Sequence, residues 1–245
     1  MRVLVLGGTA EGRALAEQLH PDVDIISSLA GRVPDPALPV GPVRIGGFGG
    51  AEGLRDWLVG NDITAVVDAT HPFAATITAN AAAACAELAL PHRVLSRPAW
   101  DPGDAMLVGS DLEAADVVAD KEYSRVFLTT GRSGSAAFRD SDAWFLIRVV
   151  TAPEPGNLPA DHELLLSRGP YCYEDEQRLI RDRQIDVVVT KNSGGELTRP
   201  KLDAAHALGV DVVMIDRPPL PAGVTVVGSV DEAVQWVLNR DSAEA

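Results

Sequence analysis

An apolar strand, a glycine turn and the start of a helix follow one another in Val3-Leu4-Val5-Leu6-Gly7-Gly8-Thr9-Ala10-Glu11-Gly12-Arg13. Glycines in such a turn let backbone amides approach a pyrophosphate, and the helix N-terminus adds partial positive charge. The spacing departs from Gly-x-Gly-x-x-Gly, and a tight turn without a ligand is the alternative. We nevertheless predict a dinucleotide site whose cofactor-binding residues are Gly7, Gly8, Thr9, Glu11, Gly12 and Arg13.

The same turn also matches the first half of a P-loop, Gly-x-x-x-x-Gly. Arg13-Ala14 stands where a P-loop needs Lys followed by Ser or Thr. That lysine reaches the terminal phosphates and the hydroxyl binds Mg²⁺. We therefore do not expect a Walker-type NTPase.

Short runs of Val, Ile and Leu alternate with helical patterns along the rest of the chain. This rhythm is typical of a parallel sheet covered by helices on both faces. Strands are predicted at 2–6, 23–27, 43–45, 64–68, 93–96, 125–130, 144–149, 163–167, 186–190, 211–215 and 225–227. Helices are predicted at 12–19, 51–59, 74–88 and 233–238, the last behind a capping box of Ser229 and Glu232.

A polar segment at 97–104, which contains Pro and Gly, interrupts this rhythm and indicates a crossover between two halves. We predict an α/β protein with two Rossmann-like domains, mainly parallel sheets and an interdomain active-site cleft. The N-terminal dinucleotide-binding domain is expected over residues 1–104. The C-terminal domain, over residues 105–245, is expected to contribute substrate and cofactor contacts.

The composition indicates where the protein is located and which kinds of partner it is not expected to bind. Hydrophobic residues make up 46% of the 245 residues, and no apolar run approaches the roughly 20 residues of a membrane span. The apolar start is too short for a signal peptide, so we expect a cytoplasmic protein. The net charge of −14 argues against a nucleic-acid partner. Cys85 and Cys172 lie far apart and outside any ligand spacing, so neither a disulfide framework nor a metal site is expected.

The end of the second predicted strand bears on the choice of cofactor. NAD sites usually place Asp or Glu there, whereas NADP sites use small or basic residues near the 2′-phosphate. Here Asp24 lies earlier in the strand, and Ser28 and Arg32 stand at its end. The sequence therefore favours NADPH, with Ser28 and Arg32 among the cofactor contacts; the alternative is that Arg32 faces solvent or substrate.

Cations follow several strands of the second half. Because the carboxyl ends of parallel strands meet at one edge, we expect Arg132, Arg168, Lys191 and Arg217 to share a rim, with Lys201 on the following helix. A single member could equally be a solvated charge. Together they suit a small ligand that carries several carboxylates or phosphates, because charge-assisted bonds are strong.

Thr70 and His71 follow the fourth predicted strand, where a histidine can orient a ligand or donate a proton, although it often only caps a helix. The sequence contains no Gly-x-Ser-x-Gly, His-Glu-x-x-His or Tyr-x-x-x-Lys. Serine hydrolases, zinc peptidases and ordinary short-chain dehydrogenases are therefore not expected.

Six segments taken together resemble the precorrin-6A reductase family of cobalamin biosynthesis, and they occur in order along the chain. They are Gly7-Gly8-Thr9-Ala10-Glu11-Gly12-Arg13, Ser28-Leu29-Ala30-Gly31-Arg32, Gly46-Gly47-Phe48-Gly49-Gly50, Asp68-Ala69-Thr70-His71-Pro72-Phe73-Ala74, Thr130-Gly131-Arg132 and Thr190-Lys191-Asn192-Ser193-Gly194-Gly195. The resemblance implies hydride transfer from NADPH to precorrin-6A, which gives precorrin-6B. It also implies two Rossmann-like domains around a cleft.

On this resemblance the second domain adds cofactor contacts from Thr190, Lys191, Asn192, Ser193 and Gly194; the alternative is a cofactor held wholly by the first domain. A macrocycle fringed with carboxylates suits the basic rim, so the substrate contacts are assigned to Thr70, His71, Arg132, Arg168, Lys201 and Arg217. Reduction also consumes a proton. Lys201, His71 and Lys191 are the candidate catalytic residues for supplying it.

Two other functions stay open. Cobalt-precorrin-6A reductase of the anaerobic pathway is similar in sequence and chemistry. A non-catalytic NADP-binding regulator would explain the first turn but leaves the basic rim without a role. A polycarboxylate tetrapyrrole is the expected partner, with no nucleic acid and no membrane; the sequence is compatible with a monomer but does not determine the oligomeric state.

Overall fold

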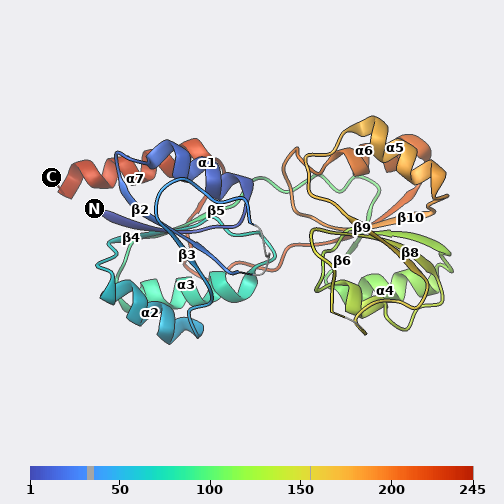
Figure 1. The fold of residues 1–245 in the computed structure, drawn as a ribbon, viewed down its shortest axis with the longest axis horizontal. Helices are drawn as coiled ribbons and strands as arrows, with labels where there is room; N and C mark the ends of the chain where they lie inside the picture. The colour runs from blue at the N-terminus through green and yellow to red at the C-terminus, as the bar shows by residue number, and fades with distance from the viewer. Residues whose placement is uncertain (32–35, 155, 245) are drawn as a thin grey trace. The chain divides into compact units, whose positions relative to one another are not determined.

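The chain divides into two compact units. The computed structural model describes residues 1–31, 36–154 and 156–244, shown as a ribbon in Figure 1. Unit 1 comprises Met1–Pro98 and Pro218–Ala245, and unit 2 comprises Ala99–Arg217. Within the described residues each unit holds one six-stranded sheet, and every strand pairing is parallel. The α/β fold class is thus confirmed. In the same residues no helix combines the length and apolar character that crossing a membrane requires.

Unit 1 is a sheet between two helical layers (Figure 1). Its strands lie in the order β12-β5-β4-β1-β2-β3, with bounds β1 (Arg2–Leu6), β2 (Asp24–Leu29), β3 (Val43–Ile45), β4 (Ala65–Asp68), β5 (His92–Leu95) and β12 (Val226–Val227). Side chains alternate along each strand. Val3 and Val5 of β1 therefore pack with α1 (Ala10–Leu19) and α7 (Val230–Glu244). Leu4 and Leu6 pack with α2 (Gly50–Gly60) and α3 (Ala75–Glu87) on the other face.

Unit 2 repeats this architecture. Its strands lie in the order β6-β11-β10-β7-β8-β9, with bounds β6 (Met106–Val108), β7 (Arg125–Leu128), β8 (Trp144–Val149), β9 (His162–Leu166), β10 (Val187–Lys191) and β11 (Asp211–Ile215). Phe127, Leu146 and Val188 pack with α5 (Tyr173–Asp182) and α6 (Pro200–Leu208). Figure 1 shows α4 (Asp111–Asp120) on the opposite face of the sheet, where it contacts the short 3-10 helix η1 (Ser135–Phe138).

Most predicted strands agree with the structure. The strands expected at 2–6, 43–45, 144–149 and 211–215 are confirmed without change, and the others differ by one or two residues at one or both ends. The three residues of β6 were not predicted, because so short a run has no visible alternation. The capping box of α7 forms only in part: Ser229 Oγ accepts a hydrogen bond from Glu232 N at 3.2 Å, but Glu232 Oε2 accepts from Gly228 N, not from Ser229 N.

The domain boundaries differ from the expected 1–104 and 105–245. The first crossing falls between Pro98 and Ala99, inside the predicted crossover segment, but residues 218–245 belong to unit 1. Val226 and Val227 of β12 pair with β5, and Ala233 and Val237 of α7 join the same core cluster as α1. A local apolar pattern predicts a strand but does not say which sheet the strand joins. The interdomain cleft stays a prediction of the sequence.

Candidate functional site

The turn between β1 and α1 has the backbone that a dinucleotide turn requires. Gly7 N donates to Ser28 O at 2.9 Å and ties the turn to β2. Gly8 has a φ of 116°, and a Cβ there would meet nothing within 4 Å. At buried Gly12 a Cβ would lie 3.3 Å from Gly7 Cα and 3.4 Å from Ala69 Cβ. Glycine at this position therefore lets α1 approach the strand ends closely.

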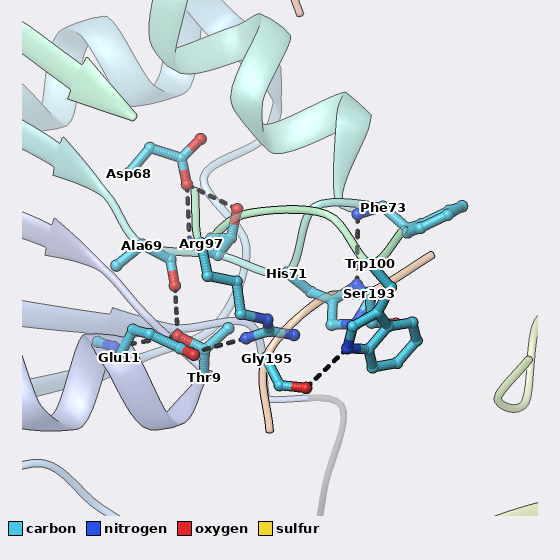
Figure 2. A network of polar contacts seen from close by, with 12 residues as sticks. Thr9, Glu11, Asp68, Ala69, His71, Phe73, Arg97, Trp100, Ser193 and Gly195 are labelled. Carbon is cyan, nitrogen blue, oxygen red and sulfur yellow. Dashed lines mark hydrogen bonds and ion pairs between the residues drawn. The ribbon is translucent and has the colours of Figure 1, made fainter. Parts of the chain in front are cut away.

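Thr9 holds this turn in place. As N-cap of α1, its Oγ1 accepts a hydrogen bond from Gly12 N at 3.0 Å and donates to Ala69 O at 2.7 Å (Figure 2). The side chain is buried. Because the hydroxyl is already used twice within unit 1, we infer that Thr9 shapes the site through the helix end.

Two charged side chains of α1 begin beside this turn. Glu11 forms an ion pair with Arg97, in which Arg97 Nη1 lies 2.7 Å from Glu11 Oε2, and both side chains are largely buried (Figure 2). Arg97 was not among the predicted site residues. Its charge offsets a carboxylate that would otherwise repel a phosphate at this helix end. Arg13, half-buried, donates its backbone N–H to Thr9 O at 3.3 Å.

The end of β2 carries a basic neighbour that the sequence analysis missed. Ser28 lies within β2, and its Oγ accepts a hydrogen bond from Arg44 Nη1 of β3 at 3.1 Å. The Arg44 guanidinium also donates to Gly46 O and Gly47 O and lies 3.7 Å from the ring centroid of Phe48. The pairing of Ser28 with Arg44 in register was the available signal, and it needed the sheet order to be seen.

Asp24 lies away from the end of β2 where an NAD site usually places an acidic residue. Asp24 is the first residue of β2, at the end away from the glycine turn, and forms an ion pair with Arg2 at 3.2 Å. Arg32, the other predicted 2′-phosphate contact, lies outside the described residues.

The segment after β4 is organised by Asp68. This carboxylate is 1% exposed, and its Oδ1 accepts hydrogen bonds from Thr70 N at 3.0 Å and Thr70 Oγ1 at 2.6 Å. Its Oδ2 is buried and has no hydrogen-bond partner among the described residues. Because the Thr70 hydroxyl gives its proton to Asp68, it can only accept a bond from a ligand.

His71 is exposed, and its Nδ1 accepts a hydrogen bond from Phe73 N at 3.3 Å (Figure 2). An Nδ1 that accepts carries no proton in the neutral ring, which places the proton on Nε2. The backbone therefore presets His71 as an Nε2–H donor.

The four predicted rim cations follow four parallel strands of unit 2, as expected: Arg132 after β7, Arg168 after β9, Lys191 at the end of β10 and Arg217 after β11. Several already have partners in the unit. Lys191 Nζ lies 3.3 Å from Asp111 Oδ2. Arg217 donates from Nε to Asn192 O at 2.8 Å and from Nη2 to Ser193 O at 3.1 Å. Arg168 is exposed and Arg132 half-buried.

The predicted cofactor segment at 190–194 begins in β10 and leads into a loop. Thr190 and Asn192 are buried, and Gly194 adopts a positive φ of 68°. The loop is held by Trp100, a residue of the segment that the sequence indicated only as a crossover. Trp100 Nε1 donates to Gly195 O at 2.8 Å (Figure 2), and Trp100 N donates to Asn192 Oδ1 at 2.9 Å.

Lys201 lies inside unit 2 and not on its rim, which corrects the predicted placement. It is 5% exposed, and its Nζ donates to Thr198 O at 2.7 Å. Burial, and then the nearby charge of Arg148, lower the pKa of Lys201 to about 7, against the opposing effect of Glu176. Arg148 and Glu176 themselves form a buried two-point ion pair, with N–O distances of 2.6 and 3.0 Å.

The predicted residues thus fall into two sets, one in each unit, and each set lies at or just after the carboxyl ends of its parallel strands. Unit 1 carries the glycine turn, Ser28, Thr70 and His71, and unit 2 carries the 190–194 segment, Arg132, Arg168 and Arg217. In the part of the chain that the structure describes, no three His, Cys, Asp or Glu side chains form a group that could hold a metal ion.

Comparisons with known proteins identify the family to which this chain is similar. The family model described as "Precorrin-6x reductase CbiJ/CobK" matches residues 2–238. A precorrin-6A reductase of Mycobacterium tuberculosis is 70% identical over 241 residues, which is 98% of this chain and 99% of that protein. The enzyme of the same name from Rhodococcus erythropolis is 52% identical, over 96% of this chain and 97% of that protein.

Two further comparisons bear on substrate and fold. A cobalt-precorrin-6A reductase of Priestia megaterium is 30% identical, over 97% of this chain and 98% of that protein. The solved structure of "CobK precorrin-6A reductase" is 37% identical and superimposes with a TM-score of 0.88, over 98% of this chain and 96% of that one.

Proposed function

The chain belongs to the precorrin-6x reductase family, and we infer from this premise that it reduces precorrin-6A in cobalamin biosynthesis. The observation that carries the inference is the match over nearly the whole chain, at 70% identity to a precorrin-6A reductase. A cytoplasmic location, where a biosynthetic reductase meets its reductant, is part of this proposal.

The metal-free substrate is favoured over the cobalt-bearing one. Identity is 70% and 52% to two precorrin-6A reductases but 30% to the cobalt-precorrin-6A reductase. A regulator without catalytic activity is disfavoured by the same comparison, because relatives of nearly the same length carry a reductase name.

The residues of unit 1 fit NADPH. The open backbone at Gly8 and the N-terminus of α1 would hold the pyrophosphate. Arg44, with Ser28 beside it, would meet the 2′-phosphate, and Asp24 is too far along β2 to accept a ribose hydroxyl at that position. When bound, NADPH supplies the hydride; the protein binds and orients the reactants and excludes water.

The substrate contacts proposed for the macrocycle are the carboxylate-binding cations Arg132, Arg168 and Arg217, together with Thr70 and His71. Guanidinium groups match carboxylates in charge and in planar geometry. As a neutral ring with its proton on Nε2, His71 would orient the macrocycle by donating a hydrogen bond, and only its imidazolium form could release a proton. For that proton His71 is favoured over Lys191 and Lys201, because its ring is exposed, whereas Lys201 Nζ is buried and bonded to Thr198 O.

The direct test follows absorbance after mixing the purified protein with precorrin-6A and NADPH, and separately with NADH. We expect oxidation of NADPH together with a changed macrocycle spectrum, and slower oxidation of NADH. Binding of NADP⁺ without any oxidation, with either the metal-free or the cobalt-bearing substrate, would favour the regulator.

Cofactor preference has its own test in Arg44→Gln, which removes the guanidinium charge beside Ser28. We expect the Kd of NADP⁺ to rise at least about tenfold while that of NAD⁺ changes little, because a charge-assisted bond to phosphate is worth roughly 1.5–3 kcal/mol. Arg55→Gln is the matched control, since Arg55 of α2 forms ion pairs with Asp56 of the same helix and with Glu87 of α3. Equal effects of Arg44→Gln on both dinucleotides, measured by calorimetry, would exclude a role in recognising the 2′-phosphate.

A further inference from the structure

The chain passes between its two units twice, and both passages reach unit 2 at the same loop. It enters unit 2 at Ala99 and leaves at Arg217. Trp100, one residue after the entry, and Arg217, at the exit, both hydrogen-bond to the loop Asn192–Gly195. This loop follows β10 at the carboxyl edge of the sheet.

Trp100 holds the loop at three points. Its N–H donates to Asn192 Oδ1 at 2.9 Å, and its carbonyl accepts from Asn192 Nδ2 at 3.2 Å, so the amide side chain pairs with the backbone as another peptide group would. Its indole Nε1 donates to Gly195 O at 2.8 Å. Trp100 is 4% exposed, so these bonds are shielded from competing water.

The indole is also fixed on its face. Lys201 Nζ lies 4.6 Å from the ring centroid and is itself bonded to Thr198 O. Rotation of the indole away from Gly195 would give up this contact and leave a buried N–H unpaired, which is costly.

Arg217 holds the first two residues of the same loop. Its guanidinium donates from Nε to Asn192 O and from Nη2 to Ser193 O, at 2.8 and 3.1 Å. Asn192 is therefore bound through its side chain by Trp100 and through its backbone by Arg217.

We propose that Trp100 is a positioning residue for the loop Asn192–Gly195, which is set in place jointly by the two passages of the chain between the units. This deepens the proposed function and rests on it, because the loop overlaps the segment 190–194 that the family resemblance assigns to cofactor contacts. Trp100 acts through the loop and not by touching either reactant.

Trp100→Phe tests the proposal, because it removes the indole N–H but keeps a ring for Lys201 and the backbone pairing with Asn192. We expect the Kd of NADP⁺ and the KM for NADPH to rise roughly three- to tenfold, as for the loss of one hydrogen bond, with kcat changed less. Amide hydrogen exchange over residues 190–197 should become faster. Trp236→Phe on α7 of unit 1 is the matched control and should change neither quantity.

A purely structural role would lower the folded fraction, and hence the apparent kcat, without raising KM or Kd. Unchanged Kd and unchanged exchange in a folded Trp100→Phe protein would therefore overturn the proposal. If that variant does not fold, amide exchange over residues 190–197 in Asn192→Asp decides in its place, since this change keeps the acceptor for Trp100 N and removes the donor to Trp100 O. Exchange is the readout for this variant, because Asn192 is itself an expected cofactor contact.

A double-mutant cycle sharpens the result. Arg217→Lys weakens the other attachment, and the two changes should be non-additive in the exchange of residues 190–197 if both act on one loop. Additive effects would contradict a joint role. Exchange and the Kd of NADP⁺ need no tetrapyrrole, so they remain decisive even if the wild-type protein fails to reduce precorrin-6A, an outcome that would refute the proposed function alone.

Discussion

After β1, unit 1 builds α1, a helix of ten residues; after β7, which has the equivalent place in the strand order, unit 2 builds only η1, of four residues. The first connection opens with glycines around a helix end, and the second carries Arg132 at the same edge. The same strand order therefore has different groups at the carboxyl edge of its sheet. In unit 1 a glycine backbone and a helix N-terminus lie there, and in unit 2 cationic side chains do.

The interiors differ as well. Among the described residues, the buried charged side chains of unit 2 are Arg148, Glu176 and Lys201. In unit 1 the buried charged side chain is Asp68, at the end of β4. Buried charges need partners, so they fix the side chains around them more narrowly than apolar contacts do. The two units thus share the strand order that determines where the candidate residues lie, but they differ in the buried charges that constrain the neighbouring side chains.

The largest effect is expected where the charged interior of unit 2 is broken. Glu176→Gln leaves Arg148 buried without a carboxylate, and we expect it to lower the free energy of unfolding by about 3–5 kcal/mol. Glu163→Gln removes the partner of Arg183 from a much more exposed pair and should cost less than about 1 kcal/mol. Urea unfolding followed by circular dichroism measures both; similar losses would mean that burial of the Arg148 pair does not matter.

The next prediction compares the loss of stability when alanine replaces one glycine of each unit, Gly12 after β1 and Gly134 after β7. A Cβ at Gly134 would overlap with Thr130 Oγ1 and Asp111 Oδ1, so Gly134→Ala should destabilise the protein by about 2–3 kcal/mol. At Gly12 the nearest atoms lie 3.3–3.5 Å away, and alanine favours the helix, so Gly12→Ala should cost less than about 1 kcal/mol. The reverse order in urea unfolding would show that the turn of unit 1 is the more tightly packed.

The lowered pKa of Lys201, in unit 2, predicts that the stability of the protein depends on pH. Its pKa is lowered to about 7 from 10.5, so between these values the unfolded chain binds more protons than the folded one. Stability should therefore rise with pH across this window, by at most about 1.4 kcal/mol per pH unit, and the contribution is constant below it. The difference in unfolding free energy between wild type and Lys201→Met, measured from pH 6 to about pH 10, should show this slope. A flat difference would indicate that Lys201 keeps its proton when folded.

The smallest effects compare two helix caps. Thr9→Ala removes both the cap of α1 and the bond to Ala69 O, and should cost about 1–2 kcal/mol. Ser110→Ala removes only the cap of α4, at about 0.5–1 kcal/mol. Thr9→Ala should also weaken NADP⁺ binding, which calorimetry can measure, whereas Ser110→Ala should not. Equal NADP⁺ affinity in both variants would separate the α1 cap from the cofactor site.

The sequence predicted the elements better than their assembly. Runs such as 144–149 are long enough for their apolar character to identify a strand, and the glycine turn at 7–12 identifies its own helix start. The side to which residues 218–245 belong depends on pairing with β5, which is distant in sequence. Local pattern contains no such information.

The placement of candidate site residues could likewise be predicted where it depends on the local sequence, but not where it depends on packing. Cations that follow strands directly, such as Arg132 and Arg217, were placed correctly at a strand edge, because parallel topology alone decides it. Lys201 was misplaced, because a lysine is ordinarily exposed and the sequence of α6 does not show that the face carrying Lys201 packs against the core. Arg148 and Glu176 were missed, although an arginine inside the apolar strand at 144–149 could have indicated a buried partner.

The return of the chain to unit 1 has a consequence for its synthesis. Residues 99–217 leave the ribosome as one uninterrupted stretch that contains every described strand and helix of unit 2. Unit 1, made first, must wait for residues 218–245 before β12 completes its sheet and α7 covers Val3, Leu15 and Leu19. During translation the half with the proposed nucleotide turn is therefore the later one to mature, and a ribosome that stalls before Pro218 leaves that half, not the other, exposed to chaperones and proteases.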